Sequence, residues 1–311
     1  MNATKRGRTS KDAPEGRSVR AWVSRLAAGV LGLTLSGALA LPAGAAGHDT
    51  DVQTLTVMAM DYSLTAPQQI PAGRTRIEIM NHGTEPHQAA LVRLKPGRTR
   101  DEYLAALAQG ALAQSLESAS EVGTFVAGPN GAQPSRTSQV TADLAPGHYI
   151  VMCLIPSPDG TPHILKGMIT ELDVTGPEHE PTQQTKRAPV VHLREFHFGV
   201  PKRFMKAAST GAPVDVINDG KQAHEMDVAQ LPDGVDVADI VAWFDHPLFT
   251  PEPYPPPQVD IAGTTMIAPG GKARIRLDLP AGRYALLCFL PDAASGTSHL
   301  HQGMVYPFTV H

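Results

Sequence analysis

The 311-residue sequence lacks several features that would place it in other classes of protein. Its apolar run from Leu26 to Leu41 covers 16 residues, whereas a membrane-spanning helix needs about 20, and no later segment could cross a bilayer. Glycine and proline, 28 residues each, follow no collagen-like period. Together with 42% hydrophobic and only 5% aromatic residues, they indicate a turn-rich β protein with a buried core.

Positive charge is scarce after the N-terminal region. The formal net charge of the whole chain is −4, but residues 1–46 carry +5, so the remainder carries −9. An acidic chain repels the phosphates of nucleic acids and of anionic lipids. We therefore expect no nucleic-acid partner, and no stable membrane insertion once the N-terminal region has been removed.

The N-terminal region has the order of a secretory signal. Basic residues between Lys5 and Arg25 precede the apolar run, and small residues follow it, without a twin-arginine pair. This order predicts a signal peptide over residues 1–46, cleavage near Ala45 or Ala46, and a periplasmic or secreted mature protein. An uncleaved membrane anchor is the alternative.

Cysteine is also scarce, with only Cys153 and Cys288 in the chain. Cysteines of exported proteins usually pair, so one disulfide is the simplest expectation. A disulfide requires Cα atoms within about 7 Å of each other. The two cysteines occupy equivalent positions of an internal repeat, however, and side-by-side sandwiches would hold equivalent interior strands further apart. The sequence therefore favours two free thiols.

Three motifs occur twice in this repeat, in the same order. Asn-x-Gly-x-x-x-His, Gly-x-Tyr-x-x-x-Cys and a His–Met pair five residues apart recur at offsets of 135 to 137 residues. A near-constant offset indicates one structural unit present in two copies. We therefore predict two domains at residues 47–175 and 189–311, joined by a polar, proline-containing linker at 176–188.

Both units are predicted to consist mainly of strands, because they contain short apolar or alternating segments bounded by proline, glycine and asparagine. These segments are 52–60, 74–80, 88–94, 139–144 and 148–154 in the first unit, and 190–198, 214–218, 226–231, 273–279, 284–290 and 304–310 in the second. Each unit also carries one expected helical insertion, at Tyr103 to Leu116 and at Val237 to Phe244. The predicted fold class is all-β: two tandem Greek-key β-sandwiches, each with a short helical insertion.

Each unit presents a histidine, then a cysteine, a second histidine and a methionine. The four are His87, Cys153, His163 and Met168 in the first unit, and His224, Cys288, His299 and Met304 in the second. Two imidazoles, a thiolate and a weak thioether describe a type 1 (blue) copper site, in which a trigonal His₂Cys set has a long axial Met bond. The sequence thus predicts up to two coppers per chain. His301 competes with His299 as a ligand, but its counterpart in the first unit is Leu165, so the repeat favours His299.

These motifs resemble those of the cupredoxins, the blue copper protein family. The Gly-x-Tyr-x-x-x-Cys segments resemble the strand that delivers the copper cysteine, and Asp61-Tyr62 and Glu195-Phe196 resemble the family's opening strands. The loop from cysteine to histidine is longer than in the small electron carriers and nearer to its length in copper nitrite reductases. Asn81 and Asn218 are candidates for hydrogen bonds that brace the site near the cysteine. The resemblance implies one-electron transfer between redox partner proteins.

Enzymatic alternatives share the resemblance, because copper nitrite reductases and multicopper oxidases are also built from cupredoxin domains. Such enzymes join a second copper centre to the blue copper through a histidine beside the cysteine. Here Met152 and Leu154 flank the first cysteine, and Leu287 and Phe289 flank the second. We therefore expect no enzyme. A copper-handling module or a metal-free interaction module is the main alternative, and a two-domain copper oxidoreductase is less favoured.

Overall fold

The computed structural model describes residues 52–110, 112–178, 188–245 and 256–311. The expected signal peptide at 1–46 and most of the expected linker lie outside the described residues. Asp49–His311 form one compact unit, so the division into two domains stays a prediction. No helix in the described part of the chain is both long and apolar enough to span a bilayer.

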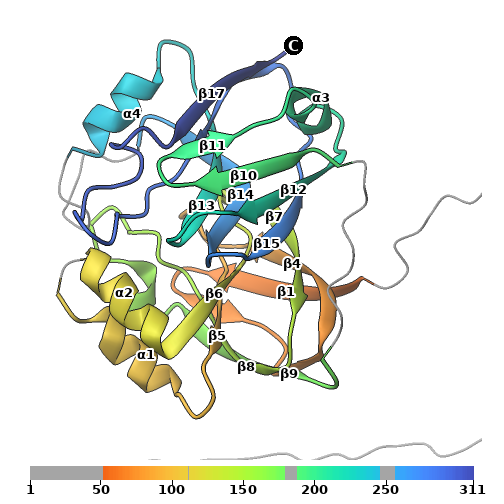
Figure 1. Ribbon diagram of the computed structural model, residues 1–311, viewed down its shortest axis with the longest axis vertical. Helices are drawn as coiled ribbons and strands as arrows, with labels where there is room; N and C mark the ends of the chain where they lie inside the picture. Colours follow the sequence, from red (N-terminus) through yellow and green to blue (C-terminus); the bar gives the residue numbers. More distant parts are fainter. Residues whose placement is uncertain (1–51, 111, 179–187, 246–255) are drawn as a thin grey trace, which may run out of the picture. The chain divides into compact units, whose positions relative to one another are not determined.

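Two sheets make up most of the described chain (Figure 1). The first sheet contains β1 (Gln53–Met60), β2 (Ser63–Thr65), β4 (Gly73–Asn81), β7 (Thr137–Leu144), β10 (Val190–Arg194), β11 (His197–Gly199), β12 (Pro213–Asn218) and β15 (Lys272–Arg276). The second contains β3 (Gln69–Pro71), β5 (Ala90–Leu94), β6 (Gly123–Ala127), β8 (Gly147–Met152), β9 (Ile169–Thr175), β13 (His224–Gln230), β14 (Val259–Ile267), β16 (Gly282–Leu287) and β17 (Val305–Val310). The chain crosses between the sheets from β4 to β5 and again from β6 to β7, as in Greek-key sandwiches. The all-β sandwich class is confirmed.

The period-two pattern of the sequence explains which face of each strand is buried. In β1, Leu55, Val57 and Ala59 are fully buried, whereas the side chains that alternate with them lie on the outer face. β8 differs, because its last four residues are all buried. This strand lies inside the second sheet, and it leads directly to one of the two cysteines.

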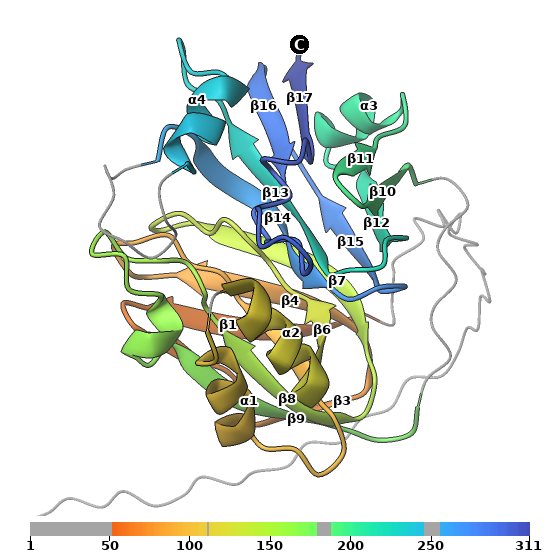
Figure 2. The ribbon, with the colours of Figure 1, turned by 60° about the vertical axis from the view of Figure 1, so that its left-hand side comes forward.

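Both sheets continue from one half of the chain into the other (Figure 2). We call residues 53–175 the N-terminal half and 190–310 the C-terminal half. β7 pairs antiparallel with β15, and β6 pairs antiparallel with β14. Outward from this junction the orders match: β7-β4-β1-β2 corresponds to β15-β12-β10-β11, and β6-β5-β8-β9 corresponds to β14-β13-β16-β17. Equivalent strands that meet antiparallel indicate a local two-fold relation between the halves.

The helices lie in connections between strands. α1 (Arg100–Leu107) begins at a capping box of Thr99 and Glu102, and α4 (Val237–Trp243) begins at a capping box of Asp236 and Asp239. The prediction of a single helix from Tyr103 to Leu116 is wrong. The insertion forms α1 and a second helix, α2 (Leu112–Val122), because Gly110 between them has a left-handed φ of +80°.

Several other elements were not predicted from the sequence. They are β2, β3, β6 and β14, the short helix α3 (Phe204–Ala208), and the 3₁₀ turn His163–Lys166. The expected strand at 190–198 forms two strands, β10 and β11, because the chain turns at Glu195 and Phe196, where Phe196 has a φ of +63°. The junction strands β6 and β14 are the most consequential omission, since they join the halves.

Candidate metal centres

A buried tyrosine anchors each strand that leads to a cysteine. The hydroxyl of Tyr149 donates to the carbonyl of Ala145 at 2.7 Å, and that of Tyr284 donates to the carbonyl of Pro280 at 2.9 Å. Both bonds reach four residues upstream, across the turn that precedes β8 or β16. They fix the start of the strand, and the strand then delivers its cysteine into the fully buried interior.

Backbone hydrogen bonds fold the following loop back toward the cysteine. In the N-terminal half, the amide of His163 donates to Ile155 at 3.0 Å, and the amide of Cys153 donates to Met168 at 3.1 Å. In the C-terminal half, the amide of His299 donates to Leu290 at 2.7 Å. The amides of Met168 and Met304 each donate to the histidine five residues earlier. Local backbone pairing therefore places cysteine, histidine and methionine together, and both methionines are fully buried.

Three donors of the N-terminal half converge. His87 comes from the loop after β4, yet its Nδ1 lies 3.1 Å from Nδ1 of His163, and the sulfur of Cys153 lies 3.4 Å from that same nitrogen. The cysteine sulfur also accepts the amide of Gln88 at 3.4 Å. We call His87, Cys153, His163 and Met168 the N-terminal centre. All four side chains are fully buried.

Carboxylates hold the outer nitrogens of both imidazoles. Nε2 of His87 lies 2.8 Å from Asp61, and Nε2 of His163 lies 2.8 Å from Glu85, which also accepts the Tyr62 hydroxyl at 2.6 Å. Although partial burial raises the pKa of Asp61, hydrogen bonds from the Thr84 and His87 side chains and from two backbone amides lower it to about 2. Burial also raises the pKa of Glu85, but hydrogen bonds from Tyr62 and His163 lower it overall. Both carboxyls are therefore ionised at neutral pH.

The tautomers of the two histidines follow from these contacts. Burial lowers the pKa of both His87 and His163, so both rings are neutral at pH 7. A neutral ring that donates Nε2–H to a carboxylate carries a lone pair on Nδ1. Two such lone pairs then face each other across 3.1 Å, beside a sulfur. A cation between them removes this repulsion, and this is the chemical argument for a metal.

The donor set fits copper. Donors that bind one ion at about 2.0–2.3 Å in a trigonal plane lie roughly 3.5–4 Å apart. The donor atoms of His87, Cys153 and His163 all lie within 4.8 Å of one another, as do those of His224, Cys288 and His299. Burial raises the pKa of the Cys153 thiol to about 12, so a bound metal must displace that proton.

The C-terminal centre, His224, Cys288, His299 and Met304, repeats the donor geometry. Nδ1 of His224 lies 3.1 Å from Nδ1 of His299, and the sulfur of Cys288 lies 3.3 Å from the latter. All four side chains are fully buried. Burial, together with the neighbouring His299, lowers the pKa of His224 to about 4. The two cysteines are free, as the repeat indicated.

The surroundings of the C-terminal centre are different. Glu195 stands 3.9 Å from Nε2 of His224, too far for a hydrogen bond. Gln222 occupies the position of Glu85, and its amide donates to Asp292 instead of to the centre. Among the described residues, neither His224 nor His299 has a hydrogen-bond partner at Nε2.

The candidate ligand His301 lies apart from the C-terminal centre. Its Nδ1 lies 2.6 Å from Ser298, and its Nε2 lies 2.9 Å from Asp245. The structure thus places His299, and not His301, beside Cys288.

The two asparagines brace the histidine loops. The Asn81 amide donates to Glu85 and Ala132 at 2.7 and 2.8 Å, and Asn218 makes the corresponding bonds to Gln222 and Ile267. They therefore hold the loops before His87 and His224, and not the cysteine itself. The sequence missed Asp61 and Glu85 as partners of the imidazoles. The Asp61-Tyr62 pair stands out in the sequence through its resemblance to the opening strand of the family, but its distance from His87 along the chain gives no sign that the two residues are in contact.

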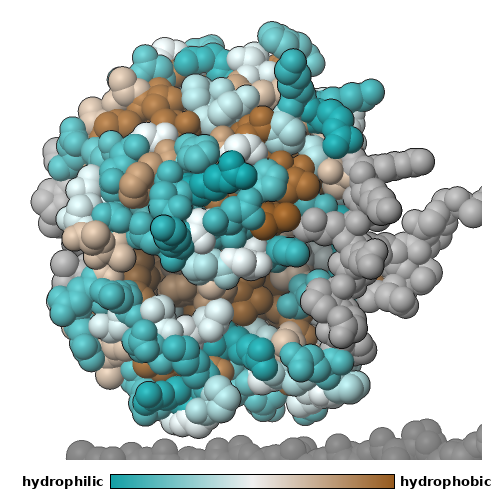
Figure 3. Space-filling view, viewed as in Figure 1, coloured by the Kyte–Doolittle hydropathy of each residue, from teal (hydrophilic) through white to brown (hydrophobic). Residues whose placement is uncertain are grey.

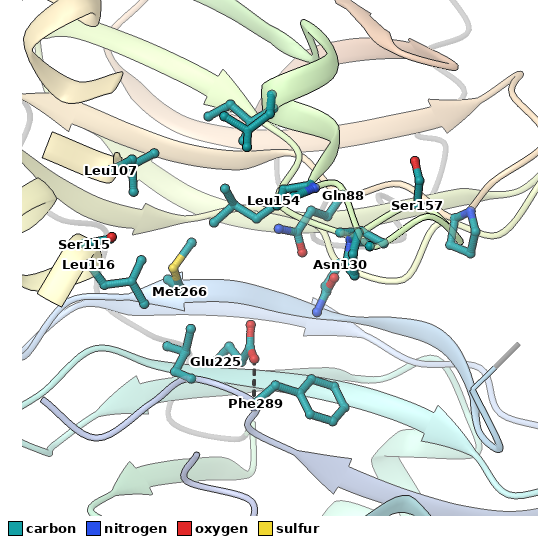
Figure 4. A pocket seen from close by; sticks show the side chains of 18 of the residues that line it. Gln88, Leu107, Ser115, Leu116, Asn130, Leu154, Ser157, Glu225, Met266 and Phe289 are labelled. Carbon is teal, nitrogen blue, oxygen red and sulfur yellow. Dashed lines mark hydrogen bonds between the residues drawn. The ribbon is translucent and has the colours of Figure 1, made fainter. Parts of the chain in front are cut away.

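A cavity of about 670 Å³ lies between the two halves, beside both centres (Figure 4). Its walls include Leu154 and Phe289, which follow the two cysteines, and Gln88 and Glu225, which follow the first histidine of each centre. Figure 3 shows a band of hydrophobic surface across the middle of this face and further hydrophobic patches above it, among mostly hydrophilic surface. The cavity is therefore an apolar space with a few polar groups.

One side of this cavity holds buried acids. One carboxylate oxygen of Glu225 accepts the amide of Phe289 at 2.9 Å, and burial raises the pKa of Glu225 to about 7. Burial, with the adjacent Asp260, raises the pKa of Asp227 well above its usual range. Asn130 of the N-terminal half donates to Asp227 at 3.2 Å and so links the halves.

No protein-family model matches the sequence, and neither does any curated protein. Among solved structures, the chain is similar to an auracyanin from Roseiflexus castenholzii, with 16% identity over 40% of this chain and 98% of that one, and a TM-score of 0.28. It is also similar to copper-containing nitrite reductases from Thermus scotoductus and Nitrosomonas europaea. Each is 13% identical over 84% of this chain, with 62% and 93% of their own lengths covered and TM-scores of 0.23 and 0.21. The case for copper here rests on the donors and their geometry.

Proposed function

We propose that this protein is an exported type 1 copper protein that transfers single electrons between redox partner proteins. The observation that carries the proposal is the pair of neutral imidazoles in the N-terminal centre. Their Nδ1 atoms converge on each other and on a buried cysteine sulfur, while their Nε2 atoms are held by ionised carboxylates. Repetition of the donor set in the C-terminal half supports two such centres per chain.

Each ligand residue would have its own role in binding the ion. A bound copper would supply a one-electron couple between Cu(I) and Cu(II). In each centre the cysteine would provide the strong thiolate bond, the two histidines the remaining in-plane donors, and Met168 or Met304 the weak axial contact. Burial of all eight side chains excludes water, and the backbone-closed loops keep the donors in place between redox states.

A visible spectrum tests the proposal. Addition of Cu(II) to the purified protein should produce a strong absorption toward the red end of the spectrum, from thiolate-to-copper charge transfer, at a stoichiometry of two per chain. A colourless protein that retains two titratable thiols after Cu(II) addition would contradict it. A protein that binds only Cu(I), without colour, would support the copper-handling alternative instead.

The cavity favours one second candidate, a copper oxidoreductase that acts on a small apolar reductant. Its walls reach the residues next to both cysteines, so a molecule bound there would lie beside both centres. Leu116→Trp would narrow the cavity from α2. If the enzyme candidate is correct, this variant should lose reduction by a small hydroquinone-type reductant and keep its exchange with a reduced cupredoxin. Retention of both reactions would contradict the enzyme candidate and leave electron transfer between proteins as the function. Loss of both would show that this part of the cavity wall is needed for electron exchange itself, which also contradicts a separate substrate site.

A further inference from the structure

One sheet face exposes an unusual set of side chains. Of the five large hydrophobic side chains that the described residues expose, three are methionines of two adjacent strands. Met58 and Met60 of β1 are 47% and 51% exposed, and Met80 of β4 is 37% exposed. Neither the electron-transfer proposal nor the packing of the core uses these side chains.

The register of β1 and β4 brings the methionines together. The strands are parallel, and Met58 lies directly beside Met80. One residue beyond β4, the amide of His82 donates to Ala59 at 2.9 Å, which continues the ladder and sets His82 beside Met60. Because strand side chains alternate, Met58, Met60, Met80 and His82 share the outer face, opposite the buried Ala59.

The spacing suits a site built from long side chains. Neighbouring strands lie about 4.8 Å apart, and residues two apart along a strand lie about 6.6 Å apart. Methionine is unbranched and flexible, so three thioethers can reach a common point above this rectangle. Among the described residues, the His82 side chain has no hydrogen-bond or ion-pair partner, and its imidazole is exposed.

The C-terminal half shows that the fold itself does not demand these residues. There the same positions on β10 and β12 carry His192, Arg194, Ile217 and Asp219. Three of these side chains pair with one another, because Asp219 lies 2.5 Å from His192 and 3.5 Å from Arg194. The soft donors are a property of the N-terminal half alone.

We propose that Met58, Met60, Met80 and His82 form a surface site for Cu(I). Thioethers and imidazole are soft to intermediate neutral donors, and they select a soft monovalent ion over Ca²⁺ or Mg²⁺. The site adjoins the N-terminal centre, since Asp61 follows Met60 and binds His87. It gives the N-terminal half a place to take up Cu(I) from solution or from a donor, outside the buried centre.

Silver(I) titration of the full mature chain tests this site without relying on the blue copper centres. With ¹³C-methyl-labelled methionine, the methyl signals of Met58, Met60 and Met80 should shift together, to completion near one equivalent assigned to this site. The triple variant Met58→Leu/Met60→Leu/Met80→Leu should lose at least tenfold in affinity for this silver equivalent. At concentrations that saturate the original chain it should therefore bind one equivalent fewer. Leucine conserves volume and these positions are exposed, so the fold is retained.

Two controls keep the outcomes distinct. Met205→Leu removes a thioether from α3 in the other half and should leave the stoichiometry unchanged. His82→Gln should weaken the site while the three methyl signals still shift. If only Met168 and Met304 shift, silver occupies the buried centres alone and the surface site is disproved. If no methionine signal shifts, the surface site is disproved as well. The two buried centres are tested separately, by the visible absorption of the protein after addition of Cu(II).

Discussion

The two centres present the same donors but differ in what stands behind them. In the N-terminal centre, ionised Asp61 and Glu85 orient both imidazoles. In the C-terminal centre, Gln222 replaces Glu85 and turns to Asp292, and Glu195 stands 3.9 Å from His224, so no described residue hydrogen-bonds the outer nitrogen of either ring. The Phe196 ring packs against His299, with ring centroids 5.4 Å apart. Nearby negative charge favours the higher oxidation state of a bound ion. The comparison teaches that one donor set can serve two centres with different affinities and potentials, set by residues outside the set.

Removal of one thiol at a time tests whether the two centres bind copper independently. Cys153→Ser and Cys288→Ser should each reduce bound copper from two per chain to one and halve the blue absorption, because each centre has its own complete donor set. Metal analysis and a visible spectrum measure this. Loss of both coppers from either variant would indicate a shared site and contradict the description of separate centres.

The next effect concerns the second histidine of the C-terminal centre. His299→Ala should remove the blue colour of that centre, because its Nδ1 lies 3.3 Å from the sulfur of Cys288. His301→Ala should leave the colour largely intact, since that ring is bound to Ser298 and Asp245. The Cys153→Ser background isolates the C-terminal signal. The reverse pattern would reassign the ligand.

Exchange of the residues at the position of Glu85 sharpens the comparison further. Glu85→Gln should weaken copper binding at the N-terminal centre by about 10- to 100-fold, because it removes the charge that orients His163. It should also raise the reduction potential of that centre toward that of the other. Affinity by competition and potential by redox titration measure the two effects. Glu171→Gln, at a surface carboxylate paired with His148, is the matched control and should change neither.

A smaller effect arises in β13, which buries Glu225 and Asp227 where the N-terminal half has Gln88 and Ala90. Folding raises the pKa of Asp227, since burial and Asp260 disfavour its charge. Above about pH 4 the unfolded chain releases this proton while the folded chain retains it, so stability falls as pH rises toward the raised pKa.

Asp227→Asn should therefore flatten the decline of Tm as the pH rises above about 4, while an oxygen still accepts the Asn130 amide. Thermal unfolding of the metal-free chain at several pH values measures this. The exposed Glu117→Gln of α2 should keep the original slope. An equally steep decline in Asp227→Asn would show that another buried acid dominates.

The donors could be predicted from the sequence because most of them are local. Cysteine, histidine and methionine fall within one short segment, and the repeat identified the distant His87 and His224. The carboxylates behind the imidazoles were not predictable, because Asp61 lies 26 residues before its partner and only the folded loop brings them together. Repetition of the motifs also suggested two equal centres, whereas Gln222 replaces Glu85 and Glu195 stands further from His224 than Asp61 does from His87.

The all-β class was predictable from period-two patterns and turn residues, but the junction was not. β6 is five residues long and follows a helix directly, so it has no flanking turn signal of its own. β14 begins only a few residues after a proline-rich stretch. Each strand pairs within its own half, β6 with β5 and β14 with β13, and also meets the other half at the junction. The local sequence pattern contains none of these pairing partners.

The shared sheets have a consequence for how this chain avoids self-association. A sandwich that ends at β6 and β7 would present two open edges, with unpaired amides and carbonyls ready to bind a strand of another molecule. Here β14 and β15 cover these edges, and β6 and β7 cover theirs in return. Each half thus acts as the edge cap of the other. Separation of the halves by proteolysis would expose the four junction edges in addition to the outer edges of the two sheets, and it would raise the tendency to aggregate.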